Sequence, residues 1–280
     1  MARGLAAAAL RARSTTRRGY TRSLYRVAVR TPVPTPGLVK LPAAWWSAAP
    51  RVRVRRLGLR LELDLRDNLS RTLYVTGTYE PGLLGLLRGA LRRGDVLVDV
   101  GAHVGVHALT AAARLRRLGG GTVVAFEPAR DSAATLRAAA ARNRLDVTVV
   151  ECALGRGPGT AELRADPAYG AADAGVRSLH GHGAAVQTVP VVAFDAWVRQ
   201  AGLDRLDVVK LDVEGAELDA LAGMRDSLAR LRPRLLSVEV KDSVLRRAGT
   251  DGAAVRRLLR DCGYRPTGRV LDRNELFVPA

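Results

Sequence analysis

Short apolar runs alternate with segments of helical periodicity from residue 83 onward, and this alternation limits the possible folds more than any other feature of the chain. Alternating strands and helices build βα units, in which the strands lie parallel and the helices cover the sheet. Runs rich in Val and Leu are typical of strands that are buried on both faces. Such strands are predicted at Val96–Val100, Thr122–Phe126, Val147–Val150, Asp207–Leu211 and Leu235–Val240. The chain is therefore predicted to be an α/β protein.

The C-terminal part is predicted to contain two helices and a hairpin. Leucines recur at helical spacing between Glu217 and Pro233, and proline, which lacks an N–H donor, ends this helix. A second amphipathic segment stops at Gly263, the residue type that most often follows a helix. The tail is predicted to form an antiparallel hairpin of Tyr264–Val270 and Glu275–Val278, which turns across residues 272–274.

The N-terminal part has a different pattern. Five prolines between residues 31 and 50 oppose both helix and sheet, which is typical of a linker. Apolar residues at nearly every second position from Val52 to Leu65 predict a half-buried strand pair, and a further strand is predicted at Thr72–Gly77. We therefore divide the chain into a basic arm (1–50), a β-hairpin extension (51–82) and a main domain (83–280).

The positive charge of the chain is concentrated at its N-terminus. Lys and Arg number 45 against 27 Asp and Glu, a net charge of +18, yet residues 1–61 hold 14 of the basic residues and none of the acidic ones. The remainder, with 31 basic and 27 acidic residues, is close to balanced. The pI of the whole chain therefore does not by itself predict a nucleic-acid-binding surface. Aromatic residues amount to only 4%, which gives base stacking little support.

The basic arm is open to several interpretations. It fits a solvated tail, an Arg-rich and acid-free organelle presequence, or a weak contact with an anionic lipid surface. Arginine outnumbers lysine 42 to 3, so we expect a bacterial protein. Cys152 and Cys262 lack the spacing of a zinc site or a disulfide framework, which favours the reducing cytoplasm. No early apolar run approaches the roughly 18 residues of a membrane span.

The sharpest motif is a glycine turn between the first predicted strand and the helix that follows it. Residues 96–105 read Val-Leu-Val-Asp-Val-Gly-Ala-His-Val-Gly, an arrangement typical of nucleotide-type cofactor sites, although an ordinary βα turn is the structural alternative. A dinucleotide fingerprint requires glycine where His103 stands, because the backbone must approach the pyrophosphate there. Asp99 would repel phosphate and attract a cation. These residues disfavour a nicotinamide oxidoreductase and favour S-adenosylmethionine, whose sulfonium and ammonium groups are positive.

Two further segments extend this cofactor site. Glu127 follows the second strand, 26 residues beyond Gly101, where a carboxylate can accept hydrogen bonds from both ribose hydroxyls. Cys152-Ala-Leu-Gly155 follows the third strand and supplies backbone and apolar side chains that suit an adenine. The alternative for Glu127 is a solvated loop acid.

A second cluster, Asp207-Val-Val-Lys-Leu-Asp-Val-Glu-Gly-Ala-Glu217, lies at the end of the fourth predicted strand. Strand alternation sends Lys210 and Asp212 to one face, at the carboxyl edge where open parallel sheets bind ligands. Glu239 lies near the end of the neighbouring strand, so Asp212 and Glu239 are expected to face each other. A like-charged pair raises one pKa and prepares a carboxylate to act as a base. The structural alternatives are a core ion pair for Lys210 and a helix N-terminus for Glu217.

In order and spacing, these motifs resemble the FkbM-like family of S-adenosylmethionine-dependent methyltransferases. The resemblance extends from about Leu65 to Gly263. It rests on Tyr79-Glu80-Pro81, Asp99-Val-Gly-Ala102 with Gly105, Phe126-Glu-Pro128, Asn143, Ala153-Leu-Gly155, Lys210-Leu-Asp-Val-Glu-Gly-Ala-Glu217, and Arg232-Pro233 before Glu239. The family usually has Asn where this chain has His103, a departure that bears on cofactor affinity.

The resemblance implies a class I methyltransferase fold: a Rossmann-like, mostly parallel seven-stranded sheet with helices on both faces, here preceded by the N-terminal β-hairpin. It implies S-adenosylmethionine as cofactor and methylation of a hydroxyl on a sugar or natural-product-type small molecule. The alternative is an RNA-modifying methyltransferase or a nucleic-acid binder that uses the basic arm. The expected site comprises cofactor residues Asp99, Gly101, Ala102, His103, Gly105, Glu127, Pro128, Ala153 and Asp212, a reacting end of Lys210, Asp212, Glu214 and Glu239, and substrate residues Tyr79, Glu80 and His180.

Asp212 is predicted to be the general base, with Glu239 as its partner or alternative. A divalent ion held by these two carboxylates, which would polarise the acceptor hydroxyl, is a variant of this mechanism. His103 and His107 are four residues apart, but no third ligand accompanies them, so a histidine metal site is not predicted. His180, in the Gly/Ala-rich stretch between the third and fourth strands, fits either a base or a solvated loop residue. No oligomeric state is indicated.

Overall fold

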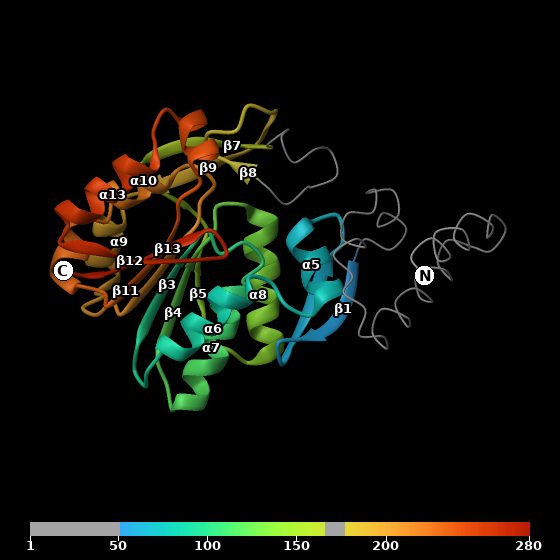
Figure 1. Ribbon diagram of the computed structural model, residues 1–280. Coiled ribbons are helices and arrows are strands. Elements are labelled where there is room, and N and C mark those ends of the chain that lie inside the picture. Colours follow the sequence, from blue (N-terminus) through green and yellow to red (C-terminus); the bar gives the residue numbers. More distant parts are fainter. Residues whose placement is uncertain (1–50, 166–176) are drawn as a thin grey trace, which may run out of the picture.

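The computed structural model describes residues 51–165 and 177–280 (Figure 1). The predicted basic arm, residues 1–50, lies outside the described residues. The elements follow in the order β1 (Arg51–Arg56), β2 (Leu59–Asp64), α5 (Asn68–Thr76), α6 (Pro81–Ala90), β3 (Val96–Val100), α7 (Val106–Leu118), β4 (Thr122–Phe126), α8 (Arg130–Asn143), β5 (Thr148–Val150), β6 (Ala153–Leu154), β7 (Gly159–Ala165), β8 (Arg177–Ser178), β9 (Ala185–Val192), α9 (Phe194–Ala201), β10 (Val208–Leu211), α10 (Glu217–Ala222), α11 (Arg225–Leu231), β11 (Leu235–Glu239), α12 (Asp242–Leu245), the 3₁₀ helix η2 (Arg246–Ala248), α13 (Gly252–Asp261), β12 (Tyr264–Leu271) and β13 (Asn274–Pro279).

A seven-stranded sheet forms the centre of the molecule, in the order β12-β13-β11-β10-β3-β4-β5. The strands from β11 to β5 are parallel, and β13 pairs antiparallel with both β11 and β12. The order reverses between β3 and β10, which are neighbours in the sheet although they are far apart in the chain. The structure therefore confirms the predicted α/β fold of the class I methyltransferases and the five predicted parallel strands. Its switch point lies between β3 and β10, where such sheets bind ligands.

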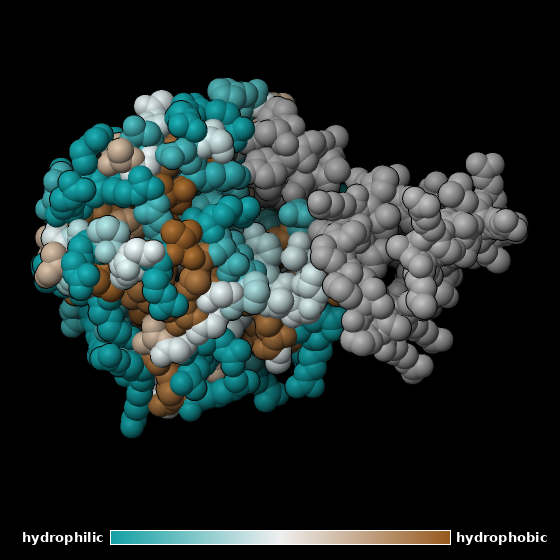
Figure 2. Space-filling model, in the orientation of Figure 1, coloured by the Kyte–Doolittle hydropathy of each residue, from teal (hydrophilic) through white to brown (hydrophobic). Residues whose placement is uncertain are grey.

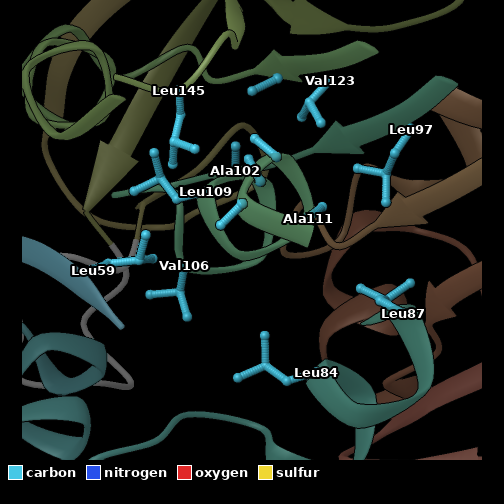
Figure 3. Close-up of a cluster of buried hydrophobic side chains, with 14 of the residues drawn as sticks. Leu59, Leu84, Leu87, Leu97, Ala102, Val106, Leu109, Ala111, Val123 and Leu145 are labelled. Carbon is cyan, nitrogen blue, oxygen red and sulfur yellow. The ribbon is translucent and has the colours of Figure 1, made fainter. Parts of the chain in front are cut away.

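Strand alternation gives the sheet two apolar faces, and each face has its own set of helices. Leu97 and Val123 belong to the core under α6, α7 and α8, whereas Val98 and Val209 belong to the core under α9 to α13. Figure 3 shows Leu97 and Val123 in one cluster with Leu109 and Ala111 of α7. Helices thus cover both faces of the sheet, which leaves the edge at the strand ends for a ligand.

The strand predicted at Thr72–Gly77 is wrong, because these residues lie at the end of α5. The N-terminal hairpin is formed by β1 and β2 alone. Asp67 begins α5 by accepting hydrogen bonds from the N–H groups of Leu69 and Ser70, at 3.3 and 2.9 Å. This N-cap outweighs the alternation of apolar residues that suggested a strand. Leu73 is the apolar residue that the helix buries completely.

The two C-terminal predictions hold with one correction. The predicted helix between Glu217 and Pro233 is two helices, α10 and α11, which separate at Gly223. The chain passes so close to another backbone there that a Cβ on Gly223 would lie 2.0 Å from the carbonyl oxygen of Gly155. The terminal hairpin is confirmed as β12 and β13, and α13 is followed by Gly263 with φ of 81°, as expected for a left-handed stop.

A second sheet, in the order β6-β9-β7-β8, is formed by the part of the chain between β5 and β10. The sequence did not predict it. Its two long strands, β7 and β9, bury only one residue each, so they lack the apolar alternation of a half-buried sheet. Gln187 of β9 accepts a hydrogen bond from the N–H of Arg130 and donates one to the carbonyl of Pro128. The small sheet thereby fixes the loop that follows β4.

Hydrophilic residues dominate the surface in Figure 2. Among the described residues, the large hydrophobic side chains with high exposure are Val186 and Val270, at 51% and 60%. Within residues 51–165 and 177–280, no helix combines the length and the apolar character that crossing a membrane requires.

Candidate active site

A cavity of about 200 Å³ opens at the carboxyl edge of the parallel strands, at the switch point between β3 and β10. The loops that follow β3, β4, β5 and β10 line it, together with the start of α5, Tyr79 and the turn between β12 and β13. Seven of the nine expected cofactor residues line this cavity. The exceptions are Asp99, which is buried beneath Lys210, and Gly105, which packs against α8.

The loop after β3 requires glycine at two positions. Gly101 has φ of 77°, and a Cβ there would lie 1.8 Å from the carbonyl oxygen of Asp212. Gly105 has φ of 86°, and a Cβ there would lie 2.1 Å from Cδ1 of Leu136 in α8. L-residues rarely adopt such φ values, and the contacts leave no room for a side chain. Gly101 therefore lets the loop after β3 lie against the backbone of the loop after β10, and Gly105 lets it pack against α8.

His103 also has a positive φ, 50°, in this turn. Asn and His tolerate the left-handed region better than most residues, so the backbone accounts for His103 where the family usually has Asn. The N–H of His103 donates to Oε2 of Glu127 at 2.7 Å, and the N–H of Ala129 donates to Oε1 at 2.8 Å. Burial raises the pKa of Glu127, while His103 and these N–H groups oppose the increase. Each carboxylate oxygen keeps a lone pair for a ribose hydroxyl.

Lys210 joins the two central strands at the centre of the site. It pairs in register with Asp99 across β3 and β10, and its Nζ lies 3.3 Å from Oδ1 of Asp99 and 3.6 Å from Oδ2 of Asp212. It also donates to the carbonyl oxygen of Gly101 at 3.0 Å. Burial lowers the pKa of Lys210, but the charges of Asp99 and Asp212 outweigh burial, so the net pKa is raised. Lys210 is therefore an ammonium that holds Asp212 in place and does not act as a base.

Asp212, Glu217 and Glu239 form a cluster in which one oxygen from each carboxylate lies within 4.8 Å of the others. Asp212 lines the cavity, whereas Glu239 is buried behind it. Burial and the charge of Asp212 raise the pKa of Glu239 to about 9. At neutral pH Glu239 therefore retains its proton, and the Asp212 side chain lies beside the ammonium of Lys210.

Glu217 has a structural role in this cluster. Its carboxylate accepts hydrogen bonds from the N–H groups of Val213 and Gly215, at 3.0 to 3.1 Å, and holds the turn after β10. Oε1 of Glu239 accepts a bond from Arg273 at 3.1 Å. Three carboxylates could hold a divalent ion here, but each already has a partner: Lys210 for Asp212, backbone N–H groups for Glu217 and Arg273 for Glu239.

Glu80 and His107 form a second buried pair, of which His107 belongs to the cavity wall. Nε2 of His107 lies 3.3 Å from Oε2 of Glu80, and Glu80 adopts φ of 44° immediately before Pro81. Burial and Asp212 raise the pKa of Glu80 to about 7, while burial and Lys210 lower the pKa of His107 to about 4. The imidazole is therefore neutral at pH 7. Tyr79 packs its ring edge-on against His107, and both residues line the cavity.

Two other expected residues have different positions. Glu214 lines the cavity in a left-handed conformation, with φ of 51°, and its carbonyl accepts a bond from Oγ of Ser178 at 2.6 Å. His180 is not brought into the cavity: its Nε2 lies 3.8 Å from Oδ2 of Asp219 in α10, and Leu179 lines the wall instead.

The sequence analysis did not identify Arg177 and Arg273, which also line the cavity. Arg177 forms an ion pair with Asp131, with an N–O distance of 2.7 Å. Arg273 lies in the turn before β13 and contacts Glu239. The predicted terminal hairpin could have indicated Arg273. Because β13 pairs antiparallel with β11, with Glu239 opposite Asn274, the turn before β13 lies at the carboxyl edge.

Comparison with known proteins gives consistent matches. The family model described as methyltransferase FkbM domain matches residues 99–266. Hexuronic acid methyltransferase AglP of Haloferax volcanii is 29% identical over 199 residues, which cover 71% of this chain and 75% of that protein. The 31-O-demethyl-FK506 methyltransferase FkbM of Streptomyces tacrolimicus is 30% identical over 184 residues, covering 55% of this chain and 69% of that protein. Among solved structures, M. jannaschii TYW2 in complex with AdoMet is 10% identical, with a TM-score of 0.43 and coverage of 82% and 87%.

Proposed function

The chain belongs to the FkbM family of methyltransferases, and from this premise we propose that it transfers the methyl group of S-adenosylmethionine to a hydroxyl of a sugar or natural-product-type small molecule. The two relatives support this acceptor class, since their names specify a hexuronic acid and a demethylated natural product. The observation that carries the proposal is the position of Asp212, which lines the cavity with its Oδ2 3.6 Å from Nζ of Lys210.

The cavity suits the cofactor. Gly101 allows the loop after β3 to approach the loop after β10, Glu127 retains lone pairs for ribose hydroxyls, and Ala153 lies on the wall that would face an adenine. Asp99 is fully buried beneath the site, where its ion pair with Lys210, at 3.3 Å, joins β3 to β10. S-Adenosylmethionine, when bound, supplies a methyl group on a positively charged sulfur.

The acceptor end is formed by side chains from separate parts of the chain. Asp212 takes up the proton that the acceptor hydroxyl loses, while Lys210 fixes its orientation and Glu239 keeps its own proton. Tyr79 belongs to the 51–82 extension, and the cavity it lines belongs mainly to residues 83–280. We therefore assign the extension to the acceptor end and residues 83–280 to catalysis. Orientation of the acceptor accounts for most of the rate enhancement.

Mass spectrometry of acceptors tests the proposal. Purified full-length protein is incubated with S-adenosylmethionine and panels of glycosides, macrolide alcohols and short RNAs. We expect a gain of about 14 Da on a hydroxyl-bearing small molecule, one methyl in place of one hydrogen. An ether product survives mild alkali, whereas a methyl ester is cleaved. Methylated RNA, an alkali-labile product or no transfer to any hydroxyl would overturn the proposed acceptor class.

A further inference from the structure

We propose that Arg273 binds an anionic group on the acceptor, in the first instance a carboxylate, so that the preferred acceptor is an acidic sugar. This inference rests on the proposed transfer to a sugar hydroxyl and narrows its substrate class. It assigns Arg273 a role in specificity, separate from the proton chemistry of Asp212.

The position of Arg273 is fixed by its turn. Asp272 and Arg273 both have positive φ, 48° and 73°, between the antiparallel strands β12 and β13. Oδ2 of Asp272 accepts a bond from the N–H of Leu83 in α6 at 2.9 Å, and its carbonyl accepts one from Nδ2 of Asn274 at 3.1 Å. The turn is thus attached to α6 and to β13 beside β11 (Figure 1). A guanidinium carried on such a turn is preorganised, which lowers the entropic cost of binding.

The guanidinium lies where an acceptor can reach it. The Arg273 side chain lines the cavity yet is 61% exposed. Its Nε lies 3.1 Å from Oε1 of Glu239, and its Nη2 lies 4.0 Å from Oε1 of Glu80. The other groups whose charge acts on it are Tyr79 and Asp212. An arginine has five N–H donors, so these two contacts leave donors for a ligand.

The two carboxyl groups nearest to Arg273 have raised pKa values. Burial first, and Asp212 second, raise the pKa of Glu80 to about 7 and that of Glu239 to about 9. At neutral pH the nearest carboxyl, Glu239, therefore keeps its proton, whereas the more distant Glu80 is partly ionised. Arg177, the other arginine of the cavity wall among the described residues, is by contrast paired with the carboxylate of Asp131. A carboxylate on the acceptor would accept two parallel N–H bonds from Arg273, the bidentate geometry that arginine favours.

A matched pair of acceptors tests this inference: p-nitrophenyl β-glucuronide and p-nitrophenyl β-glucoside, which differ in a carboxylate. We expect wild-type protein at pH 6.5 and low salt to show a kcat/KM roughly tenfold or more higher for the glucuronide, as a charged hydrogen-bond partner warrants. Arg273→Gln should bring the ratio close to one, and Arg273→Lys should restore part of it. Arg269→Gln, which removes one charge from the exposed part of the same hairpin, should keep the wild-type ratio.

The pH dependence separates recognition from folding. As pH rises from 6.5 to 9, Glu80 and then Glu239 ionise and compete for Arg273, so the wild-type preference should shrink, whereas the Arg273→Gln ratio should stay flat. Equal rates on both glycosides, or a preference that persists in Arg273→Gln, would overturn the inference and leave the methyltransferase function standing. If neither glycoside is methylated or bound by calorimetry while S-adenosylhomocysteine binds, the sugar acceptor itself is wrong.

Discussion

The two ends of the cavity, which we propose bind the cofactor and the acceptor, are formed by different kinds of interaction. At the cofactor end, backbone groups and glycines determine the shape: Gly101 and Gly105 admit no side chain, and backbone N–H groups of His103 and Ala129 hold Glu127. At the acceptor end, charged side chains from four distant segments determine the chemistry, because Lys210, Glu80, Glu239 and Arg273 influence one another's protonation.

This difference predicts how each end tolerates change. A steric requirement fails abruptly, since backbone cannot move aside by an ångström without disturbing two strands. An electrostatic arrangement fails by degrees, and its failures depend on pH and on which partner remains. Substitutions at the cofactor end should therefore remove binding, whereas substitutions at the acceptor end should change rate, specificity or stability while binding persists.

The largest effect is expected for Gly101→Ala. The new methyl group would overlap the carbonyl oxygen of Asp212 at 1.8 Å, so the loops after β3 and β10 would have to separate. We expect S-adenosylhomocysteine affinity to fall more than roughly 100-fold by calorimetry, with loss of turnover. Gly202→Ala is the matched control, because Gly202 has φ of 65° but nothing within 4 Å of its would-be Cβ.

Comparison of Gly202→Ala with Gly101→Ala separates the effect of backbone strain from that of steric overlap. A left-handed alanine costs about 1–2 kcal/mol of stability without any contact, so Gly202→Ala should lower the melting temperature by a few degrees and leave affinity intact. If Gly101→Ala bound the cofactor as well as Gly202→Ala does, the close approach of the two loops would not be what defines the cofactor end.

The next largest effect is expected for Asp212→Asn. The amide keeps the size of the side chain but cannot take up the hydroxyl proton, so turnover should fall about 100- to 10,000-fold. Affinity for S-adenosylhomocysteine should change only a few-fold, since Gly101 and Glu127 remain. Asp219→Asn, on α10 outside the cavity lining, should retain wild-type turnover. If Asp212→Asn and Asp219→Asn had comparable turnover, a group other than Asp212 would have to accept the proton.

A smaller effect, on stability, is expected for Glu239→Gln. The pKa of Glu239 is raised from an ordinary 4.5 to about 9, so the folded protein retains a proton that the unfolded chain releases. The stabilisation that the raised pKa of Glu239 gives the folded protein is fully present below pH 4.5 and is lost as pH rises through 9. The melting temperature of the variant relative to wild type should therefore increase by a few degrees between pH 5 and 9. Glu162→Gln, on the exposed face of β7, should show a constant difference.

The same contrast explains what could be predicted from sequence. The proposed cofactor end depends on local motifs, so the sequence could predict that the loop after β3 and Glu127 meet at the carboxyl edge. The acceptor end depends on tertiary neighbours: Arg273 becomes relevant only once β13 pairs with β11, and Glu80 only once α6 meets α7. The strand predicted at Thr72–Gly77 failed for a related reason, since the cap at Asp67 decides between helix and strand where periodicity is short.

The smallest effect is expected from metal removal, which tests whether the carboxylates of the acceptor end bind a cation. Glu217 is committed to the N–H groups of Val213 and Gly215, and Glu239 contacts Arg273 and retains its proton at neutral pH. An ion at this cluster would have to displace these partners and the proton together, which disfavours Lewis-acid assistance. Turnover should therefore stay within about twofold of its starting value after dialysis against a chelator, and added Mg²⁺ or Mn²⁺ should not raise it. Loss of activity that either ion restores would mean that Asp212 and Glu239 bind a cation, and the protonation of Glu239 would then describe only the metal-free protein.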